Sequence, residues 1–484
     1  MNQYEPIIGL EVHIQLNTVS KMFCGCSNMA VDAEPNTLVC PVCFGMPGTL
    51  PVANKAAVEK TLLLGRALKG NLAEMWNFER KNYFYPDLPK GYQITSSTNP
   101  PIVGGTIEVP SENEDGDVNI RIHHIHLEED AGKLSHGQDG YSYVDLNRAG
   151  TPLIELVTEP DFREGETVKQ FLQDLRLLVR SLGISDGDME NGHLRCDANV
   201  SLRLINAQAY GVKVEIKNLN SFAHVEKAIK YEIERQSGLL NQDKLVNQET
   251  RSWNENKAMT EALRTKEGVE DYRYMPEPDI PPIVRKLVPQ FSDVALDEHL
   301  AHIELPAGQL KKLIDNGINL KLAQVVIQDE ALYRLVSDVC IKVLDHQKRQ
   351  ALVTFIYDPI ARFATEHNIL LSKIALPAAD IVDIYEDILS GKITHQLLKM
   401  RLADLLKGSM TVSQLYIEAK SNAGLDVEAL IKTVIDEHPT QVAEFKAGNQ
   451  KIYGFLVGQI MARSRGQADP KKVNELLKKR LGSR

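Results

Sequence analysis

A proline-rich stretch, Met275–Pro289, divides this 484-residue chain into two parts with different sequence patterns. It contains PEPDIPP, and proline disrupts both helices and central strands. Before it, Gly, Pro and β-branched residues are frequent, whereas after about residue 295 the apolar residues recur at helical spacing. We therefore predict a domain boundary in or directly after this stretch, because a chain of this length exceeds one ordinary hydrophobic core.

The first part is predicted to be an α+β domain on a mostly antiparallel sheet, because many strand patterns occur with only a few helices. Alternating or β-branched segments indicate strands at Ile7–Leu16, Val118–His126, Tyr141–Leu146, Leu153–Val157, Leu194–Leu204 and Lys213–Lys217. Helices are expected at Asn54–Lys69, Glu164–Leu182 and Phe222–Leu239. Ser221 is a suitable N-cap for the last of these.

The second part is predicted to be helical. Helical patterns occur at Gln309–Ile314, Glu330–Val343, Gln347–Ala364, Asp380–Leu389 and Thr394–Leu406. A second break lies near Gly408–Met410, and helices resume at Thr411–Ala419, Val427–His438, Gln441–Ala447, Lys451–Arg463 and Pro470–Leu481. We therefore expect domains at residues 1–294, 295–408 and 409–484, the last two all-α.

Charge is distributed unevenly along the chain. Residues 451–484 contain nine Lys or Arg against two acidic residues, so this segment carries +7 while the remainder carries −17 of the total of −10. Such an asymmetry is typical of a protein of which one end contacts phosphate. A merely solvated helix end has the same composition, so the residues alone leave both interpretations open.

Composition predicts an intracellular globular protein. Hydrophobic residues make up 43% and charged residues 25%, which argues against a disordered or fibrous chain. No apolar run is long enough to cross a membrane, and the N-terminus lacks the basic start of a secretory signal. We expect a cytoplasmic location, where the six cysteines would be thiols or metal ligands rather than disulfides.

Four of the cysteines form two close pairs, Cys24 and Cys26, then Cys40 and Cys43. Two such pairs suit tetrahedral Zn²⁺, and a site with four thiolates leaves no open coordination position, so its role would be structural. The single residue between the first two cysteines is fewer than the usual two to four. Four partly buried thiols without a metal are the alternative. Cys196 and Cys340 lie in apolar patterns and are expected in the core.

Acidic and histidine residues occur on three of the predicted strands. Glu11 and His13 share one face of the first strand because side chains alternate with period two, and Leu10, Val12 and Ile14 would be buried on the other face. The sequence HLEED at 126–130 and Glu155 lie in two further strand segments. If the strands are neighbours, these groups could converge on Mg²⁺, which prefers oxygen ligands and bridges nucleotide phosphates. Solvated or ion-paired side chains are the alternative for each position by itself.

The segment from Phe78 to Tyr92 interleaves aromatic and basic residues, which suits a nucleotide base or an RNA end. A loop held together by its own rings is the alternative. Walker and dinucleotide glycine motifs and the G-x-S-x-G motif are missing from the sequence. The chain therefore lacks the signals of a P-loop enzyme, a dinucleotide-binding enzyme or a serine-based glutaminase.

Longer motifs carry a resemblance to a known family. They are GLEVH, CxC with CPVC, RKNYFYPDLPKGYQI, HLEEDAGK, YVDLNRAGTPLIELVTEPD, LRCDANVSLR, EIKNLNSF, DYRYMPEPDIPP and, near the C-terminus, YGFLVGQIMARSRGQADPKKVNELLKKRL. Together they resemble the B-subunit family of the aspartyl/glutamyl-tRNA amidotransferases, densely over residues 5–290 and 440–484. The resemblance implies a glutamine-synthetase-like catalytic cradle, a helical domain and a small tail domain that contacts tRNA.

The resemblance also implies a ligase reaction. ATP would phosphorylate the side-chain carboxylate of Glu-tRNA(Gln) or Asp-tRNA(Asn), and ammonia would then displace phosphate to leave the amide. The ammonia would come from an amidase A subunit, and a small C subunit would complete the heterotrimer. A non-catalytic tRNA-binding scaffold is the alternative function.

Site residues follow from the same resemblance. The Mg²⁺ ligands and catalytic residues would be Glu11, His13, Glu128 and Glu155. Structural Zn²⁺ would be held by the four paired cysteines. The cationic candidates for phosphate contact are Lys81, Arg148, Lys217 and Arg273.

Overall fold

The computed structural model describes residues 3–29, 33–110, 116–265, 272–423, 427–464, 468 and 470–482. Backbone contacts divide the chain into two compact units, Met1–Pro306 and Ala307–Arg484. Within the described residues, none of the helices combines the length and the apolar character needed to cross a membrane.

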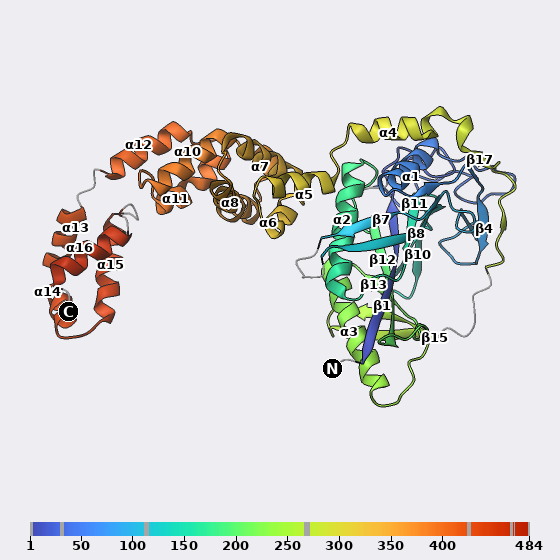
Figure 1. Ribbon diagram of the computed structural model, residues 1–484, viewed down its shortest axis with the longest axis horizontal. Coiled ribbons are helices and arrows are strands. Elements are labelled where there is room, and N and C mark those ends of the chain that lie inside the picture. Colours follow the sequence, from blue (N-terminus) through green and yellow to red (C-terminus); the bar gives the residue numbers. More distant parts are fainter. Residues whose placement is uncertain are drawn as a thin grey trace. The chain divides into compact units, whose positions relative to one another are not determined.

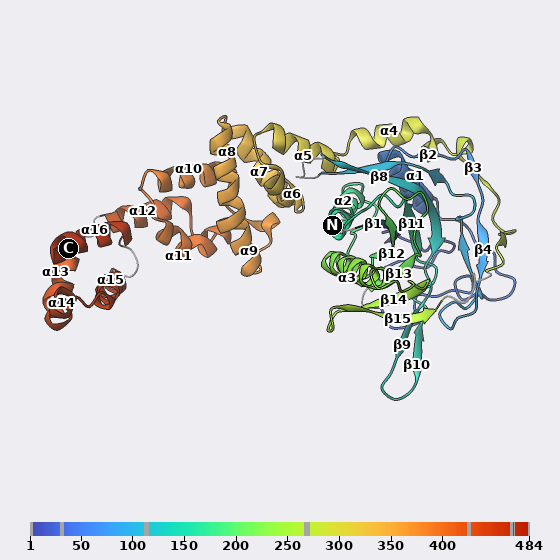
Figure 2. The ribbon, with the colours of Figure 1, turned by 60° about the horizontal axis from the view of Figure 1, so that its bottom comes forward.

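The first unit is built on a 13-stranded sheet, as Figures 1 and 2 show. Its main path runs, in spatial order, through β15 (Met259–Thr265), β14 (Glu249–Asn254), β13 (Val214–Leu219), β12 (Leu194–Leu204), β1 (Tyr4–Gln15), β11 (Pro152–Thr158), β8 (Val118–Glu129), β5 (Tyr92–Thr95), β4 (Glu79–Asn82) and β16 (Met275–Pro276). Only β13 and β14 run parallel among the described strand pairs. The predicted α+β class with a mostly antiparallel sheet is therefore confirmed.

Short strands complete this unit. Beside the main path, β8 also pairs with β6 (Ile102–Val103) and β7 (Thr106–Val109), and β6 pairs with β2 (Asn71–Leu72). Two small ladders lie apart, one of β9 (Lys133–His136) with β10 (Ser142–Asp145) and one of β3 (Met75–Trp76) with β17 (Ile283–Val284). The β9–β10 hairpin projects from the sheet in Figure 2.

The two faces of the sheet differ because side chains alternate along each strand. On β1, Leu10, Val12 and Ile14 are buried, as predicted, while Glu11 and His13 are partly accessible on the other face. The helices α2 (Gly165–Ser181) and α3 (Phe222–Leu240) lie side by side against the sheet in Figure 2. Gln236 of α3 donates to the carbonyl of Val200 on β12 at 3.1 Å. The core therefore lies on one side of the sheet, and polar side chains are left to the other.

Caps define the helix starts in this unit. Asn54 begins α1 (Lys55–Ala67) by accepting from the backbone N–H of Ala56 at 2.9 Å. Ser221 caps α3 by accepting from the N–H of His224 at 3.2 Å, as predicted. A further helix, α4 (Asp293–Ala301), was not predicted, and it joins α1 through a bidentate pair of Arg66 with Asp297 at 2.6 Å. The predicted boundary between residues 294 and 295 falls inside α4, and the three-domain division stays a prediction.

The second unit is helical throughout its described elements. Its helices are α5 (Pro306–Asp315), α6 (Leu320–Val326), α7 (Glu330–Lys342), α8 (His346–Phe355), α9 (Phe363–Glu366), α10 (Ala378–Leu389), α11 (His395–Leu406), α12 (Val412–Ala423), α13 (Val427–Glu437), α14 (Pro439–Lys446), α15 (Lys451–Arg463) and α16 (Pro470–Leu481). Between α8 and α9 the chain forms a π-helix, Ile356–Arg362, instead of the single helix predicted over Gln347–Ala364. Pro359 explains the change, because it has no N–H to donate to the preceding turn.

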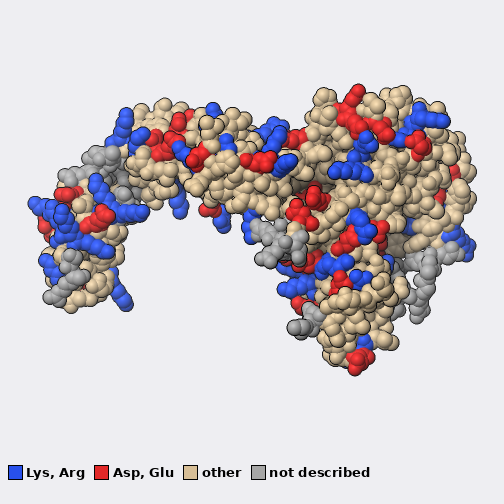
Figure 3. Space-filling view, viewed as in Figure 1, with Lys and Arg blue, Asp and Glu red and all other residues tan. Residues whose placement is uncertain are grey.

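The last four helices share one apolar core of their own. It includes Ile431 and Val434 of α13, Ile460 of α15, and Val473 and Leu477 of α16, all fully buried. Lys and Arg side chains gather on the outside of these helices in Figure 3. Lys478, Lys479 and Arg480 at the end of α16 are exposed. Arg465 and Arg484 of the predicted basic segment lie outside the described residues.

Candidate active site

The polar side of the sheet carries a row of charged side chains, which we call the polar face. It comprises Glu11 and His13 of β1, His126 and Glu128 of β8, Glu155 of β11, Arg195, Asp197 and Asn199 of β12, and Glu215 and Lys217 of β13. The antiparallel register places His13 opposite both Glu155 and Arg195. Glu155 is also opposite His126. Residues that are more than a hundred positions apart in the sequence therefore become direct neighbours.

Three of the predicted ligands meet at one point of the polar face. His13, Glu128 and Glu155 each offer one ligand atom, and these atoms lie within 4.8 Å of one another. The Nε2 atom of His13 is 3.5 Å from Glu128 and 3.4 Å from Glu155. Two carboxylates and an imidazole are a donor set that suits a hard divalent cation with one nitrogen ligand. The residues present thus fit Mg²⁺.

A second histidine, His126, completes this group and was not singled out from the sequence. Its Nε2 lies 3.3 Å from Glu155 and 3.8 Å from Glu128, and its side chain is 3% exposed. Its Nδ1 is buried without a hydrogen-bond partner among the described residues. The sequence could have identified this residue, because His126 and Glu128 are two positions apart on a strand and therefore share a face.

The electrostatics of the group favour the ionised form of Glu155. Burial by itself would raise the pKa of Glu155, but hydrogen bonds from His126 and His13 bring this pKa well below its usual range. Burial would likewise lower the pKa of His126, yet Glu128 and Glu155 raise it to about 9. The same two carboxylates raise the pKa of His13 against the effect of its burial. Without a metal, the raised pKa values of both histidines thus favour the charged imidazolium forms, which offset the negative charge.

Glu11 lies beside the three-residue group rather than within it. It shares the polar face, pairs in register with Val157 and Asp197, and accepts a hydrogen bond from Asn199 at 3.0 Å. Glu129, the neighbour of Glu128, is used differently. It accepts from the backbone N–H of Ile94 at 3.0 Å and pairs with Lys90.

The four predicted phosphate-contacting cations lie in different surroundings. Lys217 belongs to the polar face, where its Nζ is 2.6 Å from Asp197 and 3.1 Å from Glu215. These carboxylates raise its pKa against the effect of burial. Arg148 donates to the carbonyls of Ala131 and Gly132 at 3.0 and 2.7 Å, directly after the strand that carries Glu128.

The other two cations belong to the region of β4 and the segment before β16. Lys81 lies over the ring of Tyr272, 4.9 Å from its centroid. The carbonyl of Arg273 accepts from Asn82 at 2.7 Å. The structure therefore brings Lys217 to the polar face and places Lys81 and Arg273 at another edge of the sheet.

The four paired cysteines form a second compact group. Their sulfur atoms all lie within 4.8 Å of one another, and no disulfide joins these described residues. The Sγ atoms of Cys40 and Cys43 are 3.9 Å apart, and the N–H of Cys40 donates to Cys43 Sγ at 3.1 Å. Gly45 makes the turn that follows with a φ of +72°. Four thiols in this arrangement fit tetrahedral Zn²⁺.

The thiols differ in acidity because of their neighbours. The hydrogen bond from Cys24 lowers the pKa of Cys43 to about 4, and the charge of Lys21 contributes. Burial, together with the other cysteines, raises the pKa of Cys26 to about 11. As predicted, Cys196 and Cys340 are core residues, at 3% and 4% exposure.

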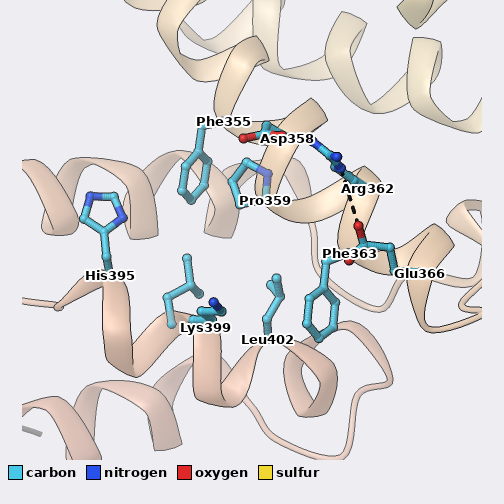
Figure 4. Close-up of a pocket in the computed structure, with 10 residues that line it drawn as sticks. Phe355, Asp358, Pro359, Arg362, Phe363, Glu366, His395, Lys399 and Leu402 are labelled. Atoms are coloured by element: carbon cyan, nitrogen blue, oxygen red, sulfur yellow. Dashed lines mark hydrogen bonds and ion pairs between the residues drawn. The ribbon is translucent and has the colours of Figure 1, made fainter. Parts of the chain in front are cut away.

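The second unit contains a separate cavity of about 270 Å³, shown in Figure 4. Phe355, Pro359 and Phe363 line it from one side, and Lys399 and Leu402 of α11 face them. The π-helix with Pro359 therefore forms one wall of this cavity. It lies within the helical unit and shares no residue with the polar face.

Comparisons with known proteins give matches over nearly the whole chain. Residues 6–287 match the family model described as the GatB/GatE catalytic domain, and residues 338–481 match the one described as the GatB domain. The B subunit of the aspartyl/glutamyl-tRNA(Asn/Gln) amidotransferase from Persephonella marina is 40% identical over 99% of this chain and 100% of its own length. The proteins of the same name from Thermodesulfovibrio yellowstonii and Synechocystis are 41% and 40% identical, each over 99% of this chain and 99% and 98% of their own lengths.

Proposed function

Since this chain belongs to the GatB/GatE family, as a B subunit of the aspartyl/glutamyl-tRNA amidotransferases, we propose that its polar face is where the amide is made. The chain is a subunit of a tRNA-dependent, glutamine-hydrolysing ligase that forms carbon–nitrogen bonds. The observation that carries the site assignment is the meeting of His13, Glu128 and Glu155 from three separate strands. Solvated acidic residues have no reason to converge in this way on one point.

The proposed reaction has two steps at one carboxylate. A carboxylate is a poor acyl donor, so the γ-phosphoryl group of ATP is first transferred to a side-chain oxygen of Glu-tRNA(Gln) or Asp-tRNA(Asn), and ADP leaves. The nitrogen of ammonia then attacks the carbonyl carbon, the bond from carbon to the phosphate oxygen breaks, and inorganic phosphate leaves with one proton released. The product is Gln-tRNA(Gln) or Asn-tRNA(Asn).

His13, Glu128 and Glu155 would hold Mg²⁺, with Glu11 beside them on the same face. When bound, the ion would neutralise charge on the phosphates and the approaching carboxylate. His126 pairs with Glu155 at 3.3 Å and with Glu128 at 3.8 Å from the buried side and thus holds both carboxylates in place. It is a positioning residue in this proposal.

Lys217 is the cation best placed to contact a phosphate. Its ammonium lies on the polar face but is held by Asp197 and Glu215, so it can exchange one carboxylate partner for a phosphate oxygen. Arg148 orders the loop that follows Glu128. Lys81 and Arg273 stay candidates for contacts with a more distant part of the nucleotide or tRNA.

The four cysteines are proposed to hold a structural Zn²⁺, because four close sulfur atoms fill a tetrahedral site without leaving an open position. The test is metal analysis of protein purified in reducing buffer without chelator. One zinc per chain is expected. Protein that is folded and free of zinc would return the four cysteines to ordinary thiols.

The partners are proposed from the family. An amidase A subunit would supply ammonia, and a small C subunit would complete a cytoplasmic heterotrimer that binds misacylated tRNA. Within this chain, residues 1–294 would be the catalytic cradle, 295–408 a helical domain and 409–484 the tail that contacts tRNA. The exposed basic residues at the end of α16 support the last assignment.

ATP hydrolysis by the assembled complex, stimulated by misacylated tRNA, tests the site. We expect Glu128→Ala and Glu11→Ala to lower this activity strongly, because both remove carboxylates from the polar face. Glu108→Ala, an exposed glutamate on β7 of the same sheet, is the matched control and should leave it unchanged. Full activity in the first two variants would favour the alternative, a non-catalytic tRNA-binding scaffold.

A further inference from the structure

A buried lysine, Lys21, contacts the cysteine group and has no part in the reaction described above. It lies between β1 and α1 in the sequence and is 0% exposed. Its ammonium donates to the carbonyls of Leu38 and Leu146 at 2.8 and 3.3 Å and to Cys43 Sγ at 3.7 Å. These three partners match the three N–H groups of an ammonium.

A buried ammonium is costly unless an opposite charge lies close to it. Carbonyl oxygens satisfy its hydrogen bonds but carry no net charge. Among the described residues, the hydrogen-bond partners of this ammonium include no carboxylate, and the one partner that can carry a negative charge is sulfur. The carboxylate of Glu129 also lies near Gly150, but it pairs with Lys90. Among the partners of Lys21, the cysteine group is therefore the one that can balance its charge.

The cysteine group needs such a charge once it binds metal. Zn²⁺ with four thiolates has a net charge of −2, and this charge would lie in a partly buried position, with Cys43 buried and the other three cysteines half-buried. We propose that Lys21 is the fixed counter-charge of this metal site, which reduces the net charge to −1 and raises the affinity for Zn²⁺. The inference rests on the proposed zinc site and adds a residue that is not a ligand.

The surrounding backbone keeps the ammonium from turning to solvent. The N–H of Lys21 donates to the carbonyl of Cys26 at 2.9 Å, and the N–H of Met22 donates to Gly150 at 2.7 Å. At Gly150, a Cβ atom would lie 3.5 Å from Lys21 Cδ and 3.6 Å from Cys43 Cβ, so these three residues are packed closely. The lysine is therefore held in one place before metal binds, and its charge is already positioned.

The experiment is a competition between the full-length chain and a chromophoric zinc chelator. Lys21→Met keeps the apolar stem and removes the charge. We expect its zinc affinity to fall roughly 10- to 100-fold, the usual effect of losing a partner that supports metal ligands. A cavity of about 490 Å³ next to the cysteine group is lined by both Lys21 and Lys55, and Lys55 is exposed. Lys55→Met is therefore the matched control, and the zinc affinity of this variant should not change. An affinity of Lys21→Met within twofold of the unchanged chain would overturn the proposal.

Thermal unfolding with and without zinc separates a charge effect from a packing effect. Lys21→Met should lower the midpoint more in the zinc-loaded chain than in the metal-free chain, because the negative charge is greater with four thiolates. An equal loss in both forms would overturn the proposal. The Co²⁺-substituted variant should keep the absorption of a tetrahedral thiolate site, which shows that the ligands are intact.

Two further outcomes concern the folding of the variants and the zinc content of the unchanged chain. Lys21→Gln is measured in the same way if Lys21→Met does not fold, and failure of both to fold with zinc present would make Lys21 a scaffold residue and overturn the proposal. Absence of zinc from the unchanged chain would instead contradict the proposed zinc site itself.

Discussion

Glu155→Gln tests the central arrangement of the polar face most directly. Glu155 lies between two histidines, 3.4 Å from His13 and 3.3 Å from His126, and contributes one of three close ligand atoms. Glutamine keeps the size of the side chain and one oxygen but removes the charge. We expect the affinity of the full-length chain for a divalent cation to fall by roughly two to three orders of magnitude.

The magnitude follows from the geometry. A cation among three atoms that lie within 4.8 Å of one another is no farther than that from Glu155. At about 4 Å and an effective dielectric constant of about 20, the attraction between unit charges is about 4 kcal/mol, so for a divalent cation it is about 8 kcal/mol. Each factor of ten in affinity corresponds to about 1.4 kcal/mol. Glu155 gives up its contacts with His13 and His126 when it binds the ion, and the amide oxygen of the variant still coordinates. Together these effects offset about half of the attraction, so two to three orders of magnitude is the expected range.

Mn²⁺ as a paramagnetic substitute for Mg²⁺ makes the assay direct, because free and bound ions are counted separately by electron paramagnetic resonance. Glu108→Gln on β7 is the control, since this exposed glutamate lies on the same sheet. NMR titration of metal-free protein adds a second measurement. The pKa of His126, raised to about 9 in part by Glu155, should fall in the Glu155→Gln variant. Unchanged Mn²⁺ affinity together with an unchanged His126 pKa would refute the arrangement described here.

Two further predictions concern stability and tRNA binding. Burial raises the pKa of Asp174 on α2 from 3.8 to about 7, because the ionised carboxylate is disfavoured in the folded protein. Ionisation of Asp174 therefore lowers the free energy of unfolding; this loss is absent below about pH 3.8 and complete above about pH 7. Asp174→Asn should therefore raise the unfolding temperature at pH 8 and have little effect near pH 4. An equal effect at both pH values would contradict the raised pKa. Asp243→Asn, at an exposed position, is the control. Replacing Lys478, Lys479 and Arg480 together by Gln should weaken tRNA binding and flatten its dependence on salt by up to about three units of slope, with glutamine hydrolysis by the complex unchanged. A filter-binding titration over a range of salt concentrations checks this, and an unaltered slope would remove α16 from the tRNA contact.

Long periodic segments made most of the fold predictable. The strand predicted at Leu194–Leu204 and the helices at Lys451–Arg463 and Pro470–Leu481 agree with β12, α15 and α16 to the residue. The missed strands are mostly short, such as β2, β3 and β6 with two residues each, and so few residues show no alternation. The π-helix was missed because Pro359 changes the hydrogen bonds without changing the apolar spacing.

The site was predictable within each strand but not between strands. Alternation placed Glu11 and His13 on one face of β1, and the structure has them there. That β1 pairs with β11, and β11 with β8, is a property of the sheet order that the separate strand patterns do not contain. The approach of His13 to Glu128 and Glu155 was therefore implied by the family resemblance and not by the strand patterns, and the structure alone separates the three-residue group from the neighbouring Glu11.

Glu128 and Glu129 show how one residue of register separates two functions. Both are buried at 3% exposure on β8, so neither burial nor residue type tells them apart. Glu129 points to the side where Lys90 and the N–H of Ile94 satisfy it, and it thereby ties β5 to β8. Glu128 points to the polar face, where it pairs with the histidines His13 and His126. The charge of a carboxylate paired with a lysine and a backbone amide is already neutralised. A carboxylate paired with imidazoles can instead exchange these partners for a metal ion. The period of two along β8 thus gives Glu129 a structural role and leaves Glu128 free to act as the proposed ligand.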